Sequence, residues 1–210
     1  MRDIPVFTTQ YGVASLILSQ IPYRKEAYIR VQAETDPERL IGECARFCRI
    51  AGAEKVYATG SRSLSNNKLH CSVVTMSGGY NQSDATDAVL VPANEETLEN
   101  WREICNDRMK NVDNASYLTV SQAKILLGKS YFVYKNSNLI GICAGKEGKI
   151  DVVASVVSGS GEDIVLALCQ QMNVSNVMCE VASTNTAAVK LYERLGFRFN
   201  DDVTDWYCVE

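Results

Sequence analysis

The stretch STNTAAVKLYERLGF, residues 183–197, has the pattern of a short amphipathic helix with a defined start and a defined end. Thr184 or Asn185 is suited to cap the first turn, because a short polar side chain there can accept a hydrogen bond from a free backbone N–H group. Gly196 can take the left-handed conformation that ends many helices. The stretch therefore predicts a stable helix near the C-terminus.

The same helix places Asn185 and Tyr192 on one face. They lie two turns apart, about 10 Å along the axis, and the small side chain of Ala188 lies between them. A narrow ligand fits along such a face. Stability alone also explains the pattern, with Tyr192 as a half-buried aromatic residue and Asn185 as a simple cap.

A second pattern, VVSGSGED at residues 156–163, joins a strand to a helix. Gly159 and Gly161 permit positive φ angles and a close approach of the backbone, and a helix N-terminus offers unpaired N–H groups. Together they predict a cradle for a phosphate or pyrophosphate group. The alternative is a tight turn in which Glu162 and Asp163 are ordinary acids of a first helical turn.

The polar stretch GGYNQSDATD, residues 78–87, has no apolar period and is the best linker candidate in the sequence. We therefore expect a boundary near Thr86, with an N-terminal α/β domain at residues 1–85 and a second domain at residues 86–210. The second domain reads as a strand, two helical segments, a meander of three strands, and then helix, strand, helix, strand. This order predicts a mixed α/β (α+β) layer fold.

The N-terminal domain repeats part of this order. The strand AYIRV, a helix over residues 37–51 and the strand KVYATG follow each other as do IDVVASVV, a helix over residues 161–172 and NVMCEV. The first helix begins with DPER, whereas the second begins with SGSG. The N-terminal domain is therefore expected to lack a second cofactor site.

Composition excludes several classes of protein. Lys and Arg number 21 against 25 Asp and Glu, with no block of like charges, which disfavours a broad nucleic-acid-binding face. The apolar run Val13–Leu18 is too short for a membrane span or a signal peptide, so we expect a cytoplasmic protein without a membrane partner. The eight cysteines form no Cys-x-x-Cys pair and His70 is the only histidine, which disfavours disulfides and a metal site.

The glycine turn and the C-terminal helix together resemble the GNAT family of N-acetyltransferases. In that family a strand, a Gly-x-Gly turn with its helix, a second strand and an Asn-containing helix ending in Leu-Tyr-Glu-x-x-Gly-Phe form the acyl-CoA site. The resemblance covers residues 88–210 and is strongest from Val153 to Phe197. It implies a mixed, mainly antiparallel sheet flanked by helices, with residues 1–85 as a degenerate GNAT-like half.

The resemblance also implies which residues contact acetyl-CoA. The residues that match the family's binding positions are Ala154, Ser155, Val156, Gly159, Ser160, Gly161, Glu162, Asp163, Asn185, Ala188 and Tyr192. The family's usual Gln or Arg before the glycine turn is Val156 here, and its usual basic loop residues are Ser158 and Ser160. Binding of the pyrophosphate is then expected to rest on backbone N–H groups.

Two catalytic roles follow from the same resemblance. Within the family, the ribosomal-protein alanine acetyltransferases carry a Glu-Val pair before the Asn, and CEVASTN places Glu180 at the matching position. This implies Glu180 as the general base, directly or through water, and Tyr192 as the general acid. Asp151, on the preceding strand, is the alternative base.

The sequence thus predicts an acyl-CoA-dependent N-acetyltransferase that transfers an acetyl group from acetyl-CoA to an amine, without a metal. The acceptor is a small molecule or a peptide whose identity stays open, because acceptor pockets are built from variable loops. A second interpretation is a GNAT-like module that binds acyl-CoA or a partner without catalysis. A nucleotide loop of a doubly wound domain is disfavoured, because the full glycine fingerprint is absent.

Overall fold

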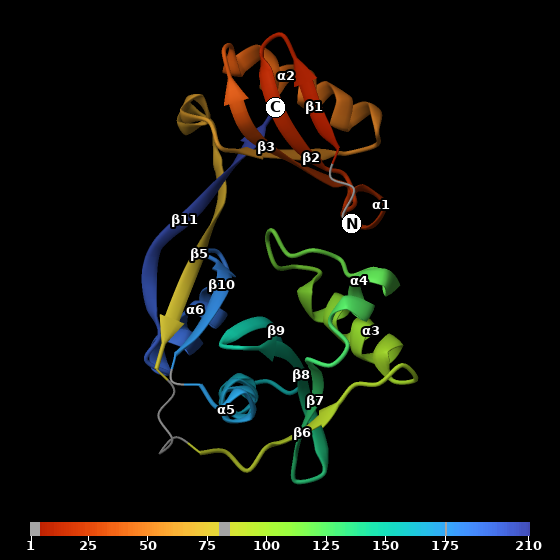
Figure 1. The fold of residues 1–210 in the computed structure, drawn as a ribbon, viewed down its shortest axis with the longest axis vertical. Coiled ribbons are helices and arrows are strands. Elements are labelled where there is room, and N and C mark those ends of the chain that lie inside the picture. Colours follow the sequence, from red (N-terminus) through yellow and green to blue (C-terminus); the bar gives the residue numbers. More distant parts are fainter. Residues whose placement is uncertain (1–4, 80–84, 175) are drawn as a thin grey trace. The chain divides into compact units, whose positions relative to one another are not determined.

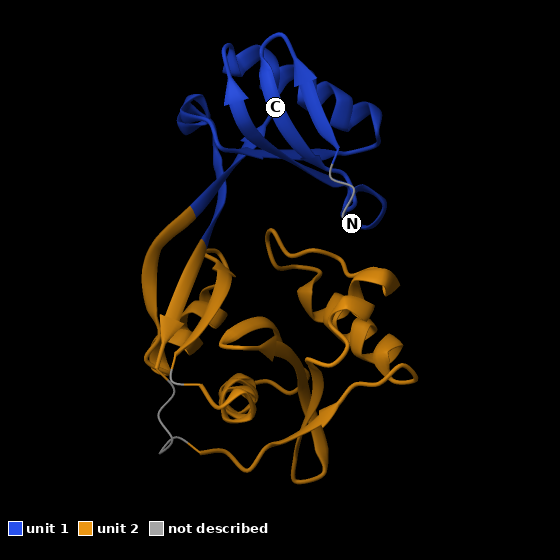
Figure 2. Ribbon diagram, viewed as in Figure 1, with its two compact units in different colours: residues 1–73, 204–210 blue, residues 74–203 orange. Residues whose placement is uncertain are grey.

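The structure is a computed structural model that describes residues 5–79, 85–174 and 176–210. The chain divides into two units, residues 1–73 with 204–210, and residues 74–203 (Figure 2). Among the described residues, no helix combines the length and the apolar character needed to cross a membrane.

The first unit contains a sheet, one long helix and two short helical turns (Figure 1). Its elements are β1 (Val6–Thr9), β2 (Gly12–Ile17), α1 (Ile21–Arg24), β3 (Glu26–Glu34), α2 (Pro37–Ile50), β4 (Lys55–Thr59), the 3-10 turn η1 (Arg62–Asn66), and parts of β5 (Leu69–Gly78) and β11 (Arg198–Val209). The strands are ordered β1-β2-β3-β4-β11. The β1–β2, β2–β3 and β4–β11 pairs are antiparallel, and the β3–β4 pair is parallel.

The second unit contains the meander that the sequence predicts and four helices among its described residues. Its elements are β6 (Val89–Pro92), α3 (Leu98–Met109), α4 (Val120–Ile125), β7 (Ser130–Lys135), β8 (Asn138–Lys146), β9 (Lys149–Ser155), α5 (Gly161–Met172), β10 (Val177–Ala182) and α6 (Thr186–Arg194). The strands are ordered β5-β10-β9-β8-β7-β6. The β7-β8-β9 meander and the β6–β7 pair are antiparallel, and β9–β10 is parallel.

Helices cover both faces of this sheet. Side chains of α5, including Ile164 and Leu168, pack with Val133 and Cys143 on one face. On the other face, the indole of Trp101 from α3 is fully buried among residues that include Ile142. The mixed, mainly antiparallel sheet flanked by helices is therefore confirmed.

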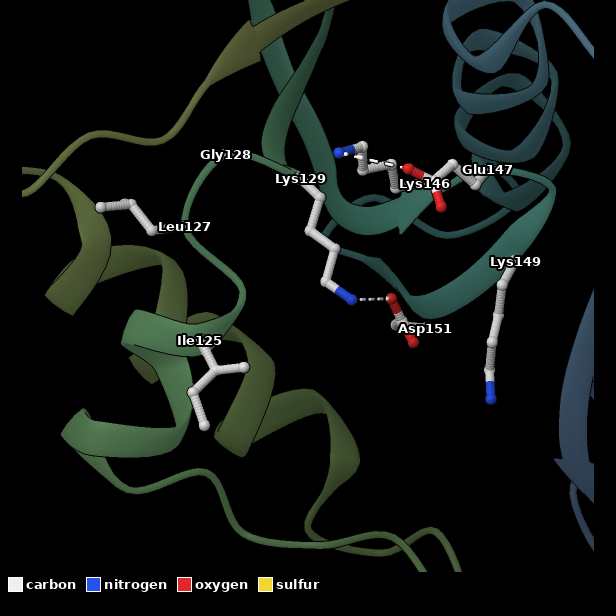
Figure 3. Close-up of a pocket in the computed structure, with 8 residues that line it drawn as sticks. All are labelled: Ile125, Leu127, Gly128, Lys129, Lys146, Glu147, Lys149 and Asp151. Carbon is white, nitrogen blue, oxygen red and sulfur yellow. Dashed lines mark hydrogen bonds and ion pairs between the residues drawn. The ribbon is translucent and has the colours of Figure 1, made fainter. Parts of the chain in front are cut away.

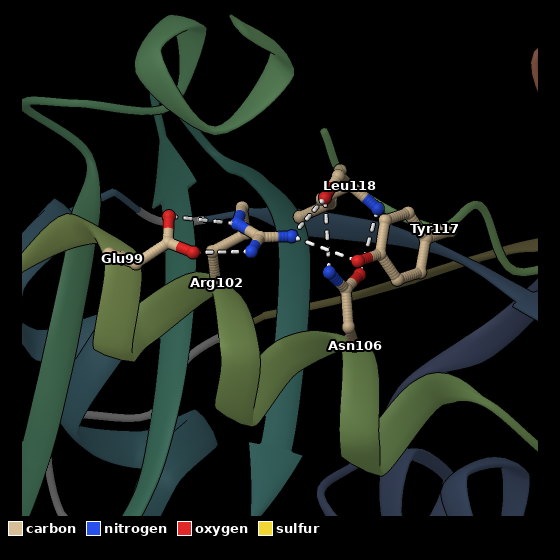
Figure 4. A network of polar contacts seen from close by, with 5 residues as sticks. All are labelled: Glu99, Arg102, Asn106, Tyr117 and Leu118. Atoms are coloured by element: carbon tan, nitrogen blue, oxygen red, sulfur yellow. Dashed lines mark hydrogen bonds and ion pairs between the residues drawn. The ribbon is translucent and has the colours of Figure 1, made fainter. Parts of the chain in front are cut away.

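A polar network fixes the segment that leads from α3 to α4 (Figure 4). The Arg102 guanidinium contacts Glu99 and donates to the Tyr117 hydroxyl, at 3.2 Å, and to the Leu118 carbonyl, at 3.0 Å. The Asn106 side chain donates to the Leu118 carbonyl and accepts from the Leu118 N–H group. The network holds the start of α4 against α3, because Thr119 follows directly and caps α4.

The division of the chain differs from the boundary expected near Thr86. It falls inside β5, after residue 73, and inside β11, after residue 203. Both strands contribute residues to each unit, and a continuous strand shows no break in its apolar pattern. Residues 80–84 of the expected linker lie outside the described residues.

Other elements differ from the sequence pattern in detail. The segment that begins at Ile21 forms the turn α1, which Pro22 starts and the left-handed Lys25 ends. This turn, strand β1 and the turn η1 were not predicted from the sequence. The last strand, β11, begins at Arg198, soon after helix α6 ends.

The eight cysteines all lie among the described residues and form no disulfide, and seven of them are buried. They pack as small apolar side chains in both units, for example Cys44 and Cys48 on α2 and Cys143 in the core of the second unit. Cys208 alone is partly exposed. Their distribution follows the apolar periodicity of the elements that carry them.

Candidate functional site

The two parallel strands of the second unit separate soon after they meet. Lys149 pairs with Met178 and Ile150 pairs with Cys179. Beyond Ile150, β9 continues to Ser155 and pairs with β8 on its other side. The described residues contain no further β9–β10 pair, so the pairing between the two strands ends there.

The first unit provides an internal comparison. Its β3 and β4 belong to the same strand-helix-strand order, yet they pair over five positions, from Glu26 with Lys55 to Arg30 with Thr59. The helix between them is closed at its start, because the Asp36 carboxylate accepts from the Arg39 N–H group at 3.2 Å. This half therefore has neither a gap between its strands nor an open helix terminus.

Helix α5 begins differently. Ser160 precedes it, but the Ser160 hydroxyl donates to the carbonyls of Ile140, at 2.9 Å, and Val157, at 2.7 Å, and makes no cap. The N–H groups of the first turn, Gly161 to Asp163, therefore have no side-chain cap from the residue before the helix. Such a terminus favours an anion.

The two glycines of the turn have different roles. Gly159 has a φ of +86°, which favours glycine, and a Cβ atom there would meet open space. Gly161 is helical, and a Cβ atom there would lie 2.8 Å from a methyl group of Leu191 on α6. Gly159 thus shapes an open turn, while Gly161 allows α6 to approach α5.

The acids beside this terminus are neutralised by cations from other elements. Lys135, at the end of β7, lies 2.9 Å from the Asp163 carboxylate, and the Thr86 hydroxyl donates to it at 2.7 Å. Partial burial opposes ionisation of Asp163, but these two contacts hold its pKa below the usual value. Glu162 lies 3.9 Å from Arg194 of α6.

A further cation lies at the end of β9. The Arg108 guanidinium, at the end of α3, donates to the Val156 carbonyl at 3.5 Å. Val156 is the position at which the sequence lacks the basic residue expected by resemblance. Arg108 is 48 residues away in sequence, so only the structure shows this proximity.

Helix α6 has the predicted start and end. The Asn185 side chain accepts from the Ala188 N–H group at 3.3 Å, which confirms Asn185 as the cap. Gly196 has a φ of +82°, and the Phe197 N–H group donates to the Tyr192 carbonyl. Tyr192 is more buried than expected, with 6% of its surface exposed.

The Tyr192 hydroxyl lies beside the Cys179 thiol. Burial, and then the neighbouring Cys179, raises the pKa of Tyr192 well above its usual value, so the hydroxyl keeps its proton. Because Cys179 is the last β10 residue that pairs with β9, this hydroxyl lies at the base of the gap between the strands.

The candidate bases are the next residues along each strand. Glu180 follows Cys179, and Asp151 follows Ile150, and both are exposed positions of their strands. Lys149 lies 3.1 Å from Glu180, and Lys129 lies 2.7 Å from Asp151. The structure therefore places all three predicted catalytic candidates, Tyr192, Glu180 and Asp151, at or next to the point where the strands separate.

The other predicted cofactor residues contribute in different ways. The Ala154 side chain is buried in the core under α3, so only its backbone is available to a ligand. Ser155 ends β9 and pairs with Gly141 of β8. Ala188 packs partly buried against the core of the second unit. Their roles in binding stay predictions.

A cavity of about 580 Å³ opens at the start of β9 (Figure 3). Its lining residues are Ile125, Leu127, Gly128, Lys129, Lys146, Glu147, Lys149 and Asp151. Apart from Asp151, sequence reasoning did not identify these residues. The cavity joins a helix end to a hairpin turn, and no local sequence pattern links those two segments.

The part of the chain that the structure describes contains no group of three or more His, Cys, Asp and Glu side chains arranged to hold a metal ion. The ionisable groups near the gap are instead paired carboxylates and lysines.

No protein-family model matches the sequence, and no curated protein matches it at a significant level. Solved structures do match. A GCN5-related N-acetyltransferase from Sphaerobacter thermophilus has a TM-score of 0.60 and 11% identity, over 94% of this chain and 76% of that chain. A GNAT-family acetyltransferase from Colwellia psychrerythraea has a TM-score of 0.55 and 12% identity, over 98% and 84%.

A conserved protein of unknown function from Staphylococcus epidermidis matches over 99% of this chain and 94% of its own, with a TM-score of 0.60 and 10% identity. Matches of this extent include the first unit as well as the second. Identities this low show the fold alone. The chain therefore has the fold of the GCN5-related N-acetyltransferases.

Proposed function

We propose that this protein is an N-acetyltransferase that transfers the acetyl group of acetyl-CoA to an amine. The observation that carries the proposal is the gap between β9 and β10, which begins after the Ile150–Cys179 pair. An uncapped helix start lies beyond one end of β9, and Tyr192, Glu180 and Asp151 gather near the other. The closed β3–β4 pair of the first unit lacks these features.

The second unit fits an elongated anionic thioester. The backbone N–H groups of Gly159 and of Gly161 to Asp163 are suited to the pyrophosphate, with Gly159 leaving room for its approach, whereas the Ser160 N–H group donates to the Val157 carbonyl. The unpaired edge of β9 after Ile150 offers backbone groups to the amide-containing arm of CoA. The thioester then lies near Cys179, beside the Tyr192 hydroxyl.

The reaction needs two proton transfers. The nitrogen of the acceptor attacks the thioester carbonyl carbon, a C–N bond forms, and the C–S bond breaks. The amine proton passes to Glu180 or Asp151, directly or through water, and the departing thiolate takes a proton from the Tyr192 hydroxyl. The products are an N-acetylated amine and CoA with a free thiol. Much of the rate comes from holding amine and thioester together.

A binding module without catalysis is the second candidate. It is favoured by the loop residues Val156, Ser158 and Ser160, which supply no positive charge to a phosphate. It is also favoured by the Lys149–Glu180 contact, which occupies the predicted base. A module that binds acyl-CoA shares the acetyl-CoA site with the enzyme, and only the enzyme forms an acetylated amine.

The test is thermal unfolding of the full chain with acetyl-CoA, and with ATP as the control anion. A ligand at one hundred times its dissociation constant stabilises the folded state by about 2.7 kcal/mol. A rise in the melting temperature with acetyl-CoA and not with ATP supports the site. Equal shifts, or no shift with acetyl-CoA, contradict it. Mass spectrometry of an amine mixture after incubation then separates the enzyme from the module.

A further inference from the structure

The cavity at the start of β9 is lined by one candidate base and by a lysine that contacts the other. Asp151 lines it, and Lys149, which also lines it, lies 3.1 Å from the Glu180 carboxylate. Asp151 and Glu180 are the first residues after the last β9–β10 pair. An amine bound in this cavity is therefore next to the place where the proposed reaction occurs.

The wall of the cavity carries more positive than negative charge. Three lysines, Lys129, Lys146 and Lys149, line it with two carboxylates, Glu147 and Asp151. Figure 3 shows Lys129 directed at Asp151 and Lys146 directed at Glu147. Ile125 and Leu127 form an apolar part of the wall.

The two ion pairs of the cavity wall differ in how easily a ligand can separate their partners. The Lys129–Asp151 pair is 2.7 Å long, and its side chains are 28% and 23% exposed. The Lys146–Glu147 pair is 3.3 Å long, and its side chains are 67% and 81% exposed. Solvated pairs contribute little to stability. Lys146 can therefore exchange Glu147 for an acidic group of a ligand at small cost.

This charge pattern discriminates between classes of acceptor. With Glu180, which contacts Lys149, the site has three ammonium groups and three carboxylates, so a polyamine finds no excess of carboxylates there. Like charges close together are unfavourable, whereas complementary charges select a partner. An acceptor with one amine and one acidic group matches a site in which lysines and carboxylates are equal in number.

We propose that the acceptor is a primary amine that carries a carboxylate or phosphate group. The amine faces Asp151 and Glu180, the acidic group faces Lys146 and Lys149, and the body of the molecule contacts Ile125 and Leu127. This assignment rests on the proposed acetyltransferase function. It concerns the acceptor alone and is independent of how tightly acetyl-CoA binds.

Matched acceptors test the assignment. Leucine is compared with leucinamide, and phosphoethanolamine with ethanolamine, with spermidine as a polycation, all with acetyl-CoA and the full chain. We expect kcat/KM to be about tenfold higher for the acidic member of each pair. The carboxylate of leucine raises the pKa of its own amine above that of leucinamide, so a smaller fraction of leucine has the unprotonated amine that can attack. This difference alone favours leucinamide, which is opposite to the expected result.

Charge variants test which residues of the cavity wall distinguish acidic acceptors from neutral ones. Lys146→Gln is expected to raise KM for the acidic acceptors about threefold and so to reduce the preference for the acidic member of each pair. Glu147→Gln should keep or increase the preference. Lys124→Gln is the control, because Lys124 is an exposed residue of α4 that does not line the cavity.

The outcomes separate the acceptor assignment from the proposed function. Transfer that favours leucinamide, ethanolamine or spermidine overturns the assignment and supports the function. An unchanged preference in Lys146→Gln also overturns it. Acetyl-CoA binding without transfer to either acidic amine contradicts the assignment as well. The absence of both transfer and an acetyl-CoA thermal shift contradicts the proposed function itself.

Discussion

The Tyr192 hydroxyl and the Cys179 thiol meet at the residue where β10 last pairs with β9. Tyr192 is therefore a core residue whose polar end reaches the base of the gap. Its ring packs against Phe197, with centroids 5.2 Å apart, which holds the side chain in place from α6. A proton donor fixed in this way is positioned before any ligand binds.

We expect Tyr192→Phe to lower kcat about a hundredfold, because the departing thiolate loses its proton donor. The KM for acetyl-CoA should change little, since the ring and its packing remain. Steady-state kinetics and thermal unfolding measure the two effects. Tyr207→Phe is the control, because it removes a hydroxyl of the first unit that contacts Asp205. A variant with normal kcat would show that Tyr192 is structural only.

Gly159→Ala should weaken acetyl-CoA binding at least about tenfold, because a side chain blocks the approach of a phosphate to the turn. The left-handed backbone also costs about 1–2 kcal/mol of stability. Gly196→Ala is a matched control, with a φ of +82° against +86° and open space at both positions. Calorimetric titration should show weaker binding for Gly159→Ala alone. Equal binding by both variants would contradict the cradle.

Arg108→Gln should raise the dissociation constant of acetyl-CoA about fivefold, since Arg108 is a partly exposed cation beside the turn. The salt dependence of binding should also become less steep, because one charge contact is lost. Arg46→Gln, on an exposed position of α2, controls for net charge. Unchanged affinity and unchanged salt dependence would show that Arg108 has no part in binding.

The buried cysteines predict a loss of stability at alkaline pH. Burial raises the pKa of Cys44, Cys105 and Cys179 to about 12, and of Cys48 and Cys169 to about 11, from 9.0. The unfolded chain therefore releases these protons first as the pH rises. Stability from this source is complete below about pH 9 and falls between about pH 9 and 12.

Urea unfolding at several pH values measures this loss. Cys105→Ala should reduce its slope, whereas Cys208→Ala should leave the slope unchanged, because Cys208 is partly exposed. In the native protein at neutral pH, a thiol reagent should modify Cys208 first. Fast modification of several cysteines, or a slope that Cys105→Ala does not change, would contradict the burial of these thiols.

The features of the fold and site that could be predicted from the sequence are those that depend on residues close together in the chain. The cap at Asn185 and the end at Gly196 depend on residues within one helix, and both are confirmed. The turn at Gly159 likewise depends on neighbours along the chain. The antiparallel meander followed from turn residues between apolar blocks, and its register fits them.

Features that depend on residues far apart in the sequence could not be predicted from it. The partner of Asp163 is Lys135, 28 residues away, so the neutralisation of that acid could not be expected from the SGSGED pattern. The burial of Tyr192 depends on Cys179 and Phe197 from other segments. The lysines of the cavity come from a loop and a hairpin whose proximity exists only in the fold.

The course of β5 and β11 has a consequence for dissection of the protein. Each of these strands belongs to both units, so a fragment of residues 86–210 lacks the strand that borders β10. Its β10 would present unpaired N–H and C=O groups, which favours aggregation. We therefore expect such fragments to be insoluble when expressed alone, and to recover solubility when residues 1–79 are supplied as a separate chain.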